Sequence, residues 1–367
     1  MKTKKTVSIL LVLALICVSF VGCSTQTPTD QEQNSTDQEE STQDTSNLEE
    51  KVQEIDYPTT NINGIVPWGA GGGTDTVCRI AASIAQESLG KSIIMNNKGG
   101  ASGSIGHQYV YDQEADGYTL LFNSEIPALY QVLGLSDLTY DQFEPIMVFT
   151  NVAGVIVVEK DSPYDTLEDL INDAKERPGE ITLGISGVGG LPHMSSLLLR
   201  ELTGAEFTTT SYEGDAPLVT NLLGKQLDVT VIAVGSATQY IENGDFKGLA
   251  VMSNNRIDSI SEVPAFSELM PEAQDALSVT GPYFGVYAKK GTPEPIIEKL
   301  TEAFKLAVED QRFLDYVKTS SSNFLGLSGD DAREYISTWQ SQNAWLLYDA
   351  GDAAESPEKF GIPRLSN

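Results

Sequence analysis

Short β-rich runs alternate with helical patterns along the first part of the chain after residue 55. In the stretch 74–89, apolar residues recur on one face of a helix, at positions 77, 80, 81, 84, 85 and 89. The pattern predicts strands over 62–68, 91–97 and 118–123, and helices over 74–89, 104–114 and 125–134. This βαβαβα order is typical of a parallel sheet with helices on its faces.

A second series of the same kind occupies roughly 157–280, after a long β-prone stretch at 143–163 that contains two apolar runs. Thr166 is placed to cap a helix that ends before Pro178 and Gly179. Further strands are predicted at 180–187, 207–214, 227–234 and 247–253, and helices at 191–202, 216–223 and 236–243.

The chain then returns as a single strand within 281–295, followed by helices at about 293–308, 310–319 and 330–349. A lone strand must pair somewhere, and the first sheet is its natural partner. We therefore expect an α/β protein of two lobes, each a mostly parallel sheet flanked by helices. Lobe 1 is 55–156 plus 281–367, and lobe 2 is 157–280. Two crossing segments, near 150–157 and near 280, form a hinge, and a ligand would lie between the lobes.

The N-terminal residues 1–22 have the form of a secretion signal, with a basic start and an apolar run over 8–21 that is short for a membrane span. Gly22 followed by Cys23 matches a bacterial lipoprotein signal, in which cleavage leaves Cys23 to carry lipid. A plain signal peptide is the alternative. Residues 23–54 are rich in Ser, Thr, Gln, Asp and Glu, and are expected to form a disordered acidic tether. We expect the protein on the extracytoplasmic face of the cell membrane, held by its lipid.

Charge and cysteine content narrow the function classes. The formal net charge is −29, which argues against a nucleic-acid partner. Beyond the signal and Cys23, only Cys78 remains, so the folded body has no internal disulfide.

A glycine-rich loop joins the first strand to the first helix, with glycines at 69, 71, 72 and 73. Glycine lets the backbone approach a ligand closely, and a helix start offers free N–H groups and partial positive charge. Together they can hold an anion without lysine or arginine. A tight turn that only packs the helix on the sheet is the alternative interpretation.

The loop does not fit a nucleotide-binding enzyme. The dinucleotide pattern would need glycine where Thr74 stands, and a P-loop ending at 90–92 would need glycine where Ala85 stands. There is no G-x-S-x-G, and the two histidines, His107 and His193, lack the companions of a catalytic or metal site. We expect no catalytic residue, no metal and no cofactor. His193 alone is more simply a loop or helix-start residue.

Residues 184–196 show the same arrangement as the first glycine-rich loop: a strand, a Gly/Ser loop and a helix with Pro192 near its start. Gly187, Gly189 and Gly190 free the backbone, and Ser186 and Ser195 offer hydroxyls. Two such loops, one in each lobe, are expected to close on one ligand from opposite sides.

Asp75 stands in the first turn of the first predicted helix, beside the proposed anion site. Its carboxylate suits the helix dipole but would repel a close anion. It could accept hydrogen bonds from the loop itself, or hold a bridging water or a ligand amine. The sequence leaves these roles open.

Six ordered segments resemble the solute receptors of tripartite tricarboxylate transporters, also called the Bug family, across about 55–327. They are VPWGAGGGTDTVCR, NKGGASGSIG, ADGYTLLF, SGVGGLPHMSS, TTSYEGDAPLVTNLLGKQLDV and GPYFGVYAKKGTPEPIIEKL. The resemblance implies a type II-like, two-lobed periplasmic-binding fold that captures a small organic carboxylate and performs no chemistry. It also implies a monomer that delivers its ligand to a membrane permease with one large and one small subunit.

The resemblance places the ligand among a set of residues from both lobes. The first lobe would contribute Gly71, Gly72, Gly73, Thr74, Asp75, Asn123 and Ser124, and the second Ser186, Gly187, Val188, Gly189, His193 and Asp215.

Departures from the family pattern put the ligand's identity in doubt. Residues 123–126, NSEI, replace a loop of small residues, and Asp215 stands where serine is common. Asp215 hints at a ligand with an amine, or is a solvated loop residue. A receptor that signals to a membrane kinase, and an α/β enzyme that uses nucleotide or phosphate, are the alternative functions.

Overall fold

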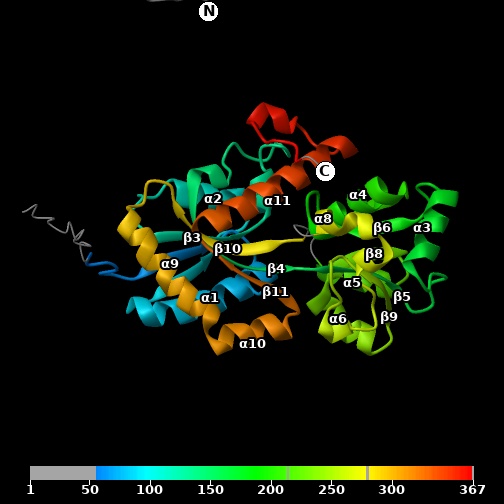
Figure 1. The fold of residues 1–367 in the computed structure, drawn as a ribbon, viewed down its shortest axis with the longest axis horizontal. Helices are drawn as coiled ribbons and strands as arrows, with labels where there is room; N and C mark the ends of the chain where they lie inside the picture. The colour runs from blue at the N-terminus through cyan, green and yellow to red at the C-terminus, as the bar shows by residue number, and fades with distance from the viewer. Residues whose placement is uncertain (1–54, 213–214, 278–280, 366–367) are drawn as a thin grey trace, which may run out of the picture. The chain divides into compact units, whose positions relative to one another are not determined.

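The computed structural model describes residues 55–212, 215–277 and 281–365. The predicted signal 1–22, the lipidation site Cys23 and the tether 23–54 lie outside the described residues. Within the described part, the strands form a six-stranded and a five-stranded sheet (Figure 1). None of the helices described there combines the length and apolar character needed to cross a membrane.

The first sheet has the strand order β11-β4-β10-β3-β1-β2. Strand β1 pairs in parallel with β2 and β3, while β10 pairs antiparallel with β3 and β4, and β11 antiparallel with β4. The strands are β1 (Ile62–Val66), β2 (Ile93–Asn97), β3 (Thr119–Ser124), β4 (Phe143–Val152), β10 (Tyr283–Lys289) and β11 (Ser322–Leu327).

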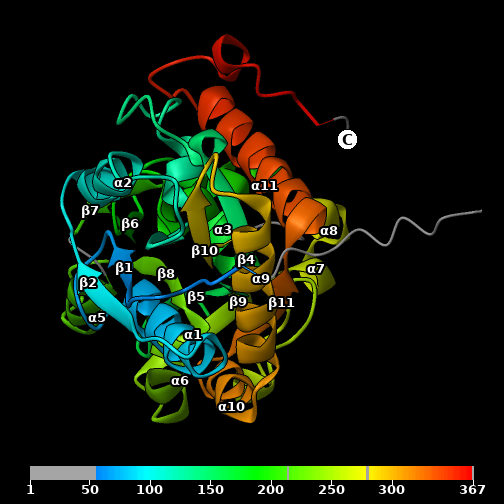
Figure 2. The ribbon, with the colours of Figure 1, turned by 90° about the vertical axis from the view of Figure 1, so that its left-hand side faces the viewer.

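Helices cover both faces of this sheet (Figure 2). On one face, Leu120 and Phe122 of β3 pack in a core with α1 and α9, while Leu121 packs on the other face with α2 and α11. This alternation is the period-two pattern of a strand buried on both sides. The helices are α1 (Gly73–Leu89), α2 (Ser104–Tyr111), α9 (Glu294–Glu309), α10 (Gln311–Thr319) and α11 (Gly329–Ala350).

The second sheet has the order β7-β6-β8-β5-β9, in which β6 is parallel to β7 and β8, and β5 is antiparallel to β8 and β9. Helices α3, α4, α7 and α8 share a core with one face, and α5 and α6 with the other. The strands are β5 (Gly154–Glu159), β6 (Thr182–Ile185), β7 (Thr208–Ser211), β8 (Val229–Ala233) and β9 (Phe246–Val251). The helices are α3 (Leu167–Glu176), α4 (Leu191–Thr203), α5 (Asp215–Leu223), α6 (Val234–Glu242), α7 (Phe266–Leu269) and α8 (Gln274–Leu277).

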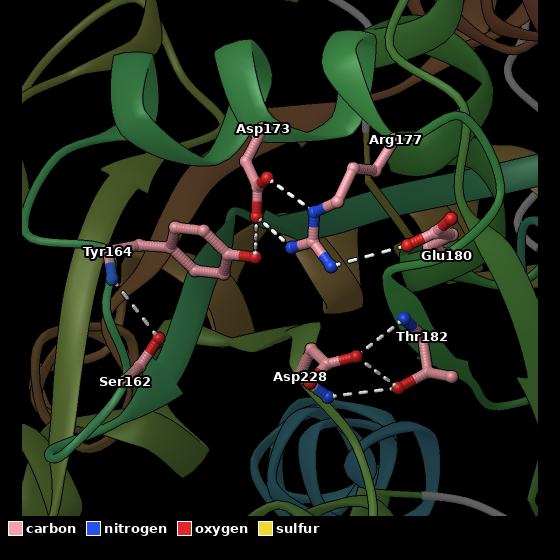
Figure 3. A network of polar contacts seen from close by, with 7 residues as sticks. All are labelled: Ser162, Tyr164, Asp173, Arg177, Glu180, Thr182 and Asp228. Carbon is pink, nitrogen blue, oxygen red and sulfur yellow. Dashed lines mark hydrogen bonds and ion pairs between the residues drawn. The ribbon is translucent and has the colours of Figure 1, made fainter.

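A polar network fastens the end of α3 to the segment before it (Figure 3). The Tyr164 hydroxyl donates to Asp173 over 2.6 Å, and the Arg177 guanidinium donates to the same carboxylate. These hydrogen bonds lower the pKa of Asp173 to about 2. Nearby, the Thr182 amide donates to Asp228 over 2.7 Å and joins the starts of β6 and β8. The network belongs to the fold of the second sheet, and none of its residues lines the cleft described below.

The predicted two-lobed α/β architecture is confirmed, and β10 pairs with the first sheet as expected. The sheets are mixed, however, where a mostly parallel arrangement was predicted. The reason is that β4, β5 and β10 belong to the segments that pass between the sheets. Of these, β10 runs antiparallel to β3, and β5 runs antiparallel to β8, whereas β4 is antiparallel to β10 and so runs in the same direction as β3. No pattern in the sequence predicts the two reversals.

The short helices α7 and α8 were not predicted, and two elements that line the cleft also differ from the sequence prediction. The helix expected at 125–134 is a short 3-10 turn, η2 (Ile126–Leu129), with Pro127 near its start, and Gln340 of α11 donates to the carbonyl oxygen of Ala128. Strand β11 was not predicted, because its partly exposed residues show no regular alternation of polar and apolar side chains, and it forms by pairing with β4.

The crossing segments contact one another where they pass between the sheets. Only Ala153 separates β4 from β5, and the Val152 amide donates to the carbonyl oxygen of Pro282 over 2.9 Å. Gly281 has φ +80°, and a Cβ there would collide with the carbonyl oxygen of Val152. Glycine is therefore required for this close backbone approach.

Candidate functional site

A cleft of about 1410 Å³ is lined by residues that follow strands of both sheets. The first sheet contributes Trp68, 69–74, Ser102, 124–126, Val152, Pro282, Phe284, Tyr316, Ser320 and Ser322. The second contributes 186–188, Gly190, Leu191, Ala216, Val219, Thr220, Ala233, Gly235, Ser236 and Tyr240.

Two helices begin at this cleft with nearly the same backbone geometry. Before α1, Gly71 has φ +80° and the N-cap Gly72 has φ −74° and ψ 170°. Before α4, Gly189 has φ +81° and the N-cap Gly190 has φ −73° and ψ 166°. The first-turn N–H groups of a helix have no intrahelical partner, and no N-cap side chain accepts from them in either helix.

Asp75 organises the first of these loops. Its Oδ2 accepts from the Gly71 amide over 2.9 Å, and its Oδ1 accepts from Arg79 Nε at 2.9 Å and Asn97 Nδ2 at 2.8 Å. Burial alone would raise the pKa of Asp75, but these hydrogen bonds lower it below its ordinary value. The carboxylate is thus ionised, paired and turned into its own loop.

His193 occupies the same position in the second loop. Its Nδ1 accepts from the Gly189 amide over 3.1 Å, four residues earlier, as Asp75 does from Gly71. Its Nε2 lies 3.4 Å from Oδ2 of Asp352, which follows α11. Burial lowers the pKa of His193, against the opposing influence of Asp352. The neutral tautomer with its proton on Nε2 satisfies both contacts.

The end of β3 forms the floor beside the first loop. Asn123 is fully buried, and its Oδ1 accepts from Trp68 Nε1 over 2.7 Å and from the Ser124 amide over 2.9 Å. Its Nδ2 has no hydrogen-bond partner among the described residues. Asn123 therefore positions Trp68 and Ser124, both of which line the cleft.

The structure brings eight of the residues singled out from the sequence to the cleft: Gly71, Gly72, Gly73, Thr74, Ser124, Ser186, Gly187 and Val188. Asp75, Asn123 and His193 lie buried behind it, and Gly189 borders a smaller cavity of about 20 Å³. Helix α5 begins at Asp215 and brings Ala216, Val219 and Thr220 to the cleft. The side chain of Asp215 is outside the described part of the structure.

Several cleft residues were not found from the sequence. They are the aromatic Trp68, Tyr240, Phe284 and Tyr316, and the hydroxyl-bearing Ser102, Ser236, Ser320 and Ser322. Glu125 also lines the cleft, in the loop 123–126 that was expected to face it, but it was not singled out. Ser102 has φ +53°, a left-handed conformation that costs a non-glycine residue about 1–3 kcal/mol and is often found at functional sites. The glycines around it, at 100 and 103, were the available signal.

The chemistry of the cleft is that of backbone N–H groups, hydroxyls and aromatic rings. Among its lining residues in the described ranges, none is lysine, arginine or histidine. Across the described residues, no group of His, Cys, Asp and Glu is arranged to hold a metal ion. Cys78 is a buried free thiol in the core, and it does not reach the cleft.

Two mixed sheets with flanking helices, joined by crossing segments and facing a common cleft, define the class of two-lobed periplasmic solute-binding proteins. The chain belongs to the tripartite tricarboxylate transporter family receptors, whose family model matches residues 77–344. It is 30% identical over 312 residues to protein BugT of Bordetella pertussis (strain Tohama I). That alignment covers 84% of this chain and 94% of BugT.

Solved structures of similar binding proteins have the same fold as this chain. The periplasmic binding protein BugD is 29% identical with a TM-score of 0.69, and the match covers 81% of this chain and 99% of BugD. Rpa4515 of R. palustris, solved with adipate, is 28% identical with a TM-score of 0.71, and the match covers 81% and 99% of the two chains.

Proposed function

We propose that this protein is an extracytoplasmic receptor that captures a small organic carboxylate in the cleft and delivers it to a tripartite tricarboxylate-type permease. The observation that carries the proposal is the pair of matching, uncapped helix N-termini at 71–74 and 189–191. Both have a glycine with positive φ followed by an extended glycine N-cap. Backbone N–H groups and helix dipoles at such ends bind anions without any basic side chain.

The environment of Asp75 and His193 supports this interpretation. Each side chain holds the amide of a loop glycine, Gly71 or Gly189, so the loops are preorganised before any ligand arrives. Preorganised donors lose little conformational entropy on binding, which favours affinity. We propose that Asp75, Asn123 and His193 act on the ligand through the loops they position, and that Asp215 faces the cleft from the start of α5.

The cleft is larger than a typical small-molecule pocket of about 300–1,000 Å³. We infer that lobe 1 (55–156 plus 281–367) and lobe 2 (157–280) close on the ligand by moving about the crossing segments. Strand β5 of the second sheet begins at Gly154, three residues before the proposed start of lobe 2. The similar protein Rpa4515 of R. palustris was solved with adipate, which supports a small organic carboxylate as the ligand here.

We further propose that the mature chain begins at Cys23, carries lipid there and is held on the extracytoplasmic face by the acidic segment 23–54, as a monomer. The Gly22-Cys23 pattern and the polar composition after it motivate this. Mass spectrometry of the mature N-terminus would show an unmodified residue there if the anchor is absent.

A thermal-shift screen of the full chain, purified in detergent, tests the carboxylate proposal. Dicarboxylates, tricarboxylates, amino acids and aromatic acids would each be added at rising concentration. A ligand at one hundred times its Kd stabilises the folded state by about 2.7 kcal/mol, which raises Tm measurably. If no acid raises Tm while a nucleotide or sugar does, the proposal is wrong.

Acidification should weaken binding through His193. When the imidazole gains a proton, Nδ1 carries a hydrogen and can no longer accept from the Gly189 amide. The competent neutral form is present above the lowered pKa of His193 and is lost as the pH falls through it. The loss of one hydrogen bond corresponds to roughly a threefold to tenfold rise in Kd. Asp75 remains ionised over this range because its pKa is lowered from 3.8.

Titration calorimetry between pH 7.5 and pH 5 measures this effect. His193→Asn is the matched variant, because its side-chain oxygen can accept from Gly189 at any pH. Glu125, with a pKa of about 7, titrates in both proteins, so the effect of His193 is the affinity that the native chain loses relative to the variant as the pH falls. Identical profiles for the two proteins would show that His193 does not control the loop.

A further inference from the structure

Glu125 is the one carboxylate among the described residues that line the cleft, and no basic side chain accompanies it there. It follows directly after β3 (Thr119–Ser124), so the sheet fixes its backbone at the cleft floor. An ionised Glu125 would repel a second anionic group on a ligand, because the cleft walls supply no cation to offset it.

The surroundings of Glu125 leave its charge uncompensated. The residue is 6% exposed, and its Oε2 has no hydrogen-bond partner in the described structure. The Glu125 backbone and the Ser124 side chain act to lower the pKa of Glu125, and Glu125 in turn raises the pKa of tyrosines at 130, 283, 287 and 335. Burial raises the pKa of Glu125 to about 7, as expected for a carboxyl that lacks a counter-ion.

Of the two cavities that Glu125 borders, only the cleft has room for a cationic group of a ligand. On its other side Glu125 borders a cavity of about 20 Å³, lined by Ser195, Trp339, Gln342 and Asn343 among others. That volume holds about one water molecule. A water there can donate a hydrogen bond, but it does not neutralise a buried charge.

We propose that Glu125 is the cation-binding end of the cleft, so that the ligand carries an ammonium group as well as a carboxylate. The inference rests on the proposed function, in which the carboxylate binds at the glycine loops. The ammonium would ion-pair with the Glu125 carboxylate once the side chain turns toward the cleft, because Oε2 has almost no exposed surface in this structure. The unpartnered oxygen would then gain a charge-assisted hydrogen bond. An amino carboxylate thus suits both ends of the site, whereas a dicarboxylate of the same length places an anion against Glu125.

Calorimetry with matched ligands tests the proposal on the full chain. The probes are 4-aminobutanoate, 5-aminopentanoate and 6-aminohexanoate, each compared with the dicarboxylate and the monocarboxylate of equal carbon number, at pH 8, where Glu125 is mostly ionised. At the best length, the amino acid should bind about tenfold or more tightly than the monocarboxylate, and the dicarboxylate more weakly than both.

Glu125→Gln should remove this discrimination, so that the amino acid and the monocarboxylate bind within about twofold of one another. Glu159→Gln is the matched control. Glu159 is also buried but pairs with Lys225, and it does not line the cleft, so this variant should keep the native preference.

The outcomes separate the inference from the function on which it rests. If the dicarboxylate binds most tightly at every length, or if Glu125→Gln keeps the amino-acid preference, the ammonium inference is wrong and carboxylate capture stands. If none of these acids and no acid in the thermal-shift screen binds, the proposed function fails and the inference fails with it. Should Glu125→Gln not fold, the preference of the native chain alone decides.

Discussion

Replacing Gly72 with valine is expected to weaken ligand binding by about a hundredfold without unfolding the protein. Gly72 is the N-cap of α1, with φ −74° and ψ 170°, a conformation that valine adopts readily. A Cβ there would approach nothing closer than the carbonyl oxygen of Gly69, at 3.6 Å. The branched side chain would instead stand where the ligand meets the loop. Loss of two charge-assisted hydrogen bonds, about 1.5 kcal/mol each, corresponds to roughly this factor.

Gly99→Val is the control for this substitution. Gly99 also has a conformation open to other residues, and its nearest atom to a new Cβ is 3.7 Å away, but it does not line the cleft. Calorimetry gives the affinities and denaturant unfolding gives the stabilities of both variants. Native affinity in Gly72→Val would show that the backbone of this loop does not contact the ligand.

Removing the carboxylate of Asp75 should have the largest effect on stability. Asp75→Ala leaves the Gly71 amide, Arg79 and Asn97 without their shared acceptor in a position where Asp75 is 3% exposed. Unpaired buried donors and a broken buried ion pair cost roughly 2–4 kcal/mol in total, after allowance for the partly exposed Arg79. The loop would also lose its shape, so ligand affinity should fall with stability.

Asp349→Ala makes the same substitution in an exposed pair. Asp349 accepts from Arg364 at 2.7 Å and 2.8 Å, but both side chains are about half exposed, so the cost should stay below about 1 kcal/mol. Guanidinium unfolding at pH 7 compares the two. Equal costs would mean that Asp75 is a surface charge rather than the organiser of its loop.

Much of the fold could be predicted from the hydrophobic pattern, because α1, α4 and the strands before them have strong periodicity and clear breaks. The glycine loops were predicted as a pair for the same reason. The two loops are more alike than their glycine content indicates. In both, a side chain four residues after a positive-φ glycine accepts a hydrogen bond from the amide of that glycine, and this side chain is Asp75 in one loop and His193 in the other. That spacing is visible in GGGTD and GGLPH, but residues so different in charge do not suggest one shared role.

The cleft residues and the strand that were not predicted depend on tertiary contacts, which cannot be read from a single sequence. The family resemblance places the loop 123–126 at the cleft, but only the structure, with η2 packed under α11, shows that Glu125 is buried there. Tyr316 and Ser320 reach the cleft because α10 lies beside β11, a strand that exists through its pairing with β4. Ser102 enters through a left-handed turn that no propensity predicts for serine.

Hydrogen–deuterium exchange of the free and the ligand-saturated chain shows whether the two helix starts hold the ligand, because it reports on the backbone amides themselves. We expect a bound carboxylate to slow exchange in peptides covering 71–76 and 188–194 together, while exchange in peptides covering α3 (Leu167–Glu176) is unchanged. Saturating binding that leaves both glycine loops unprotected would contradict the claim that these helix starts hold the ligand.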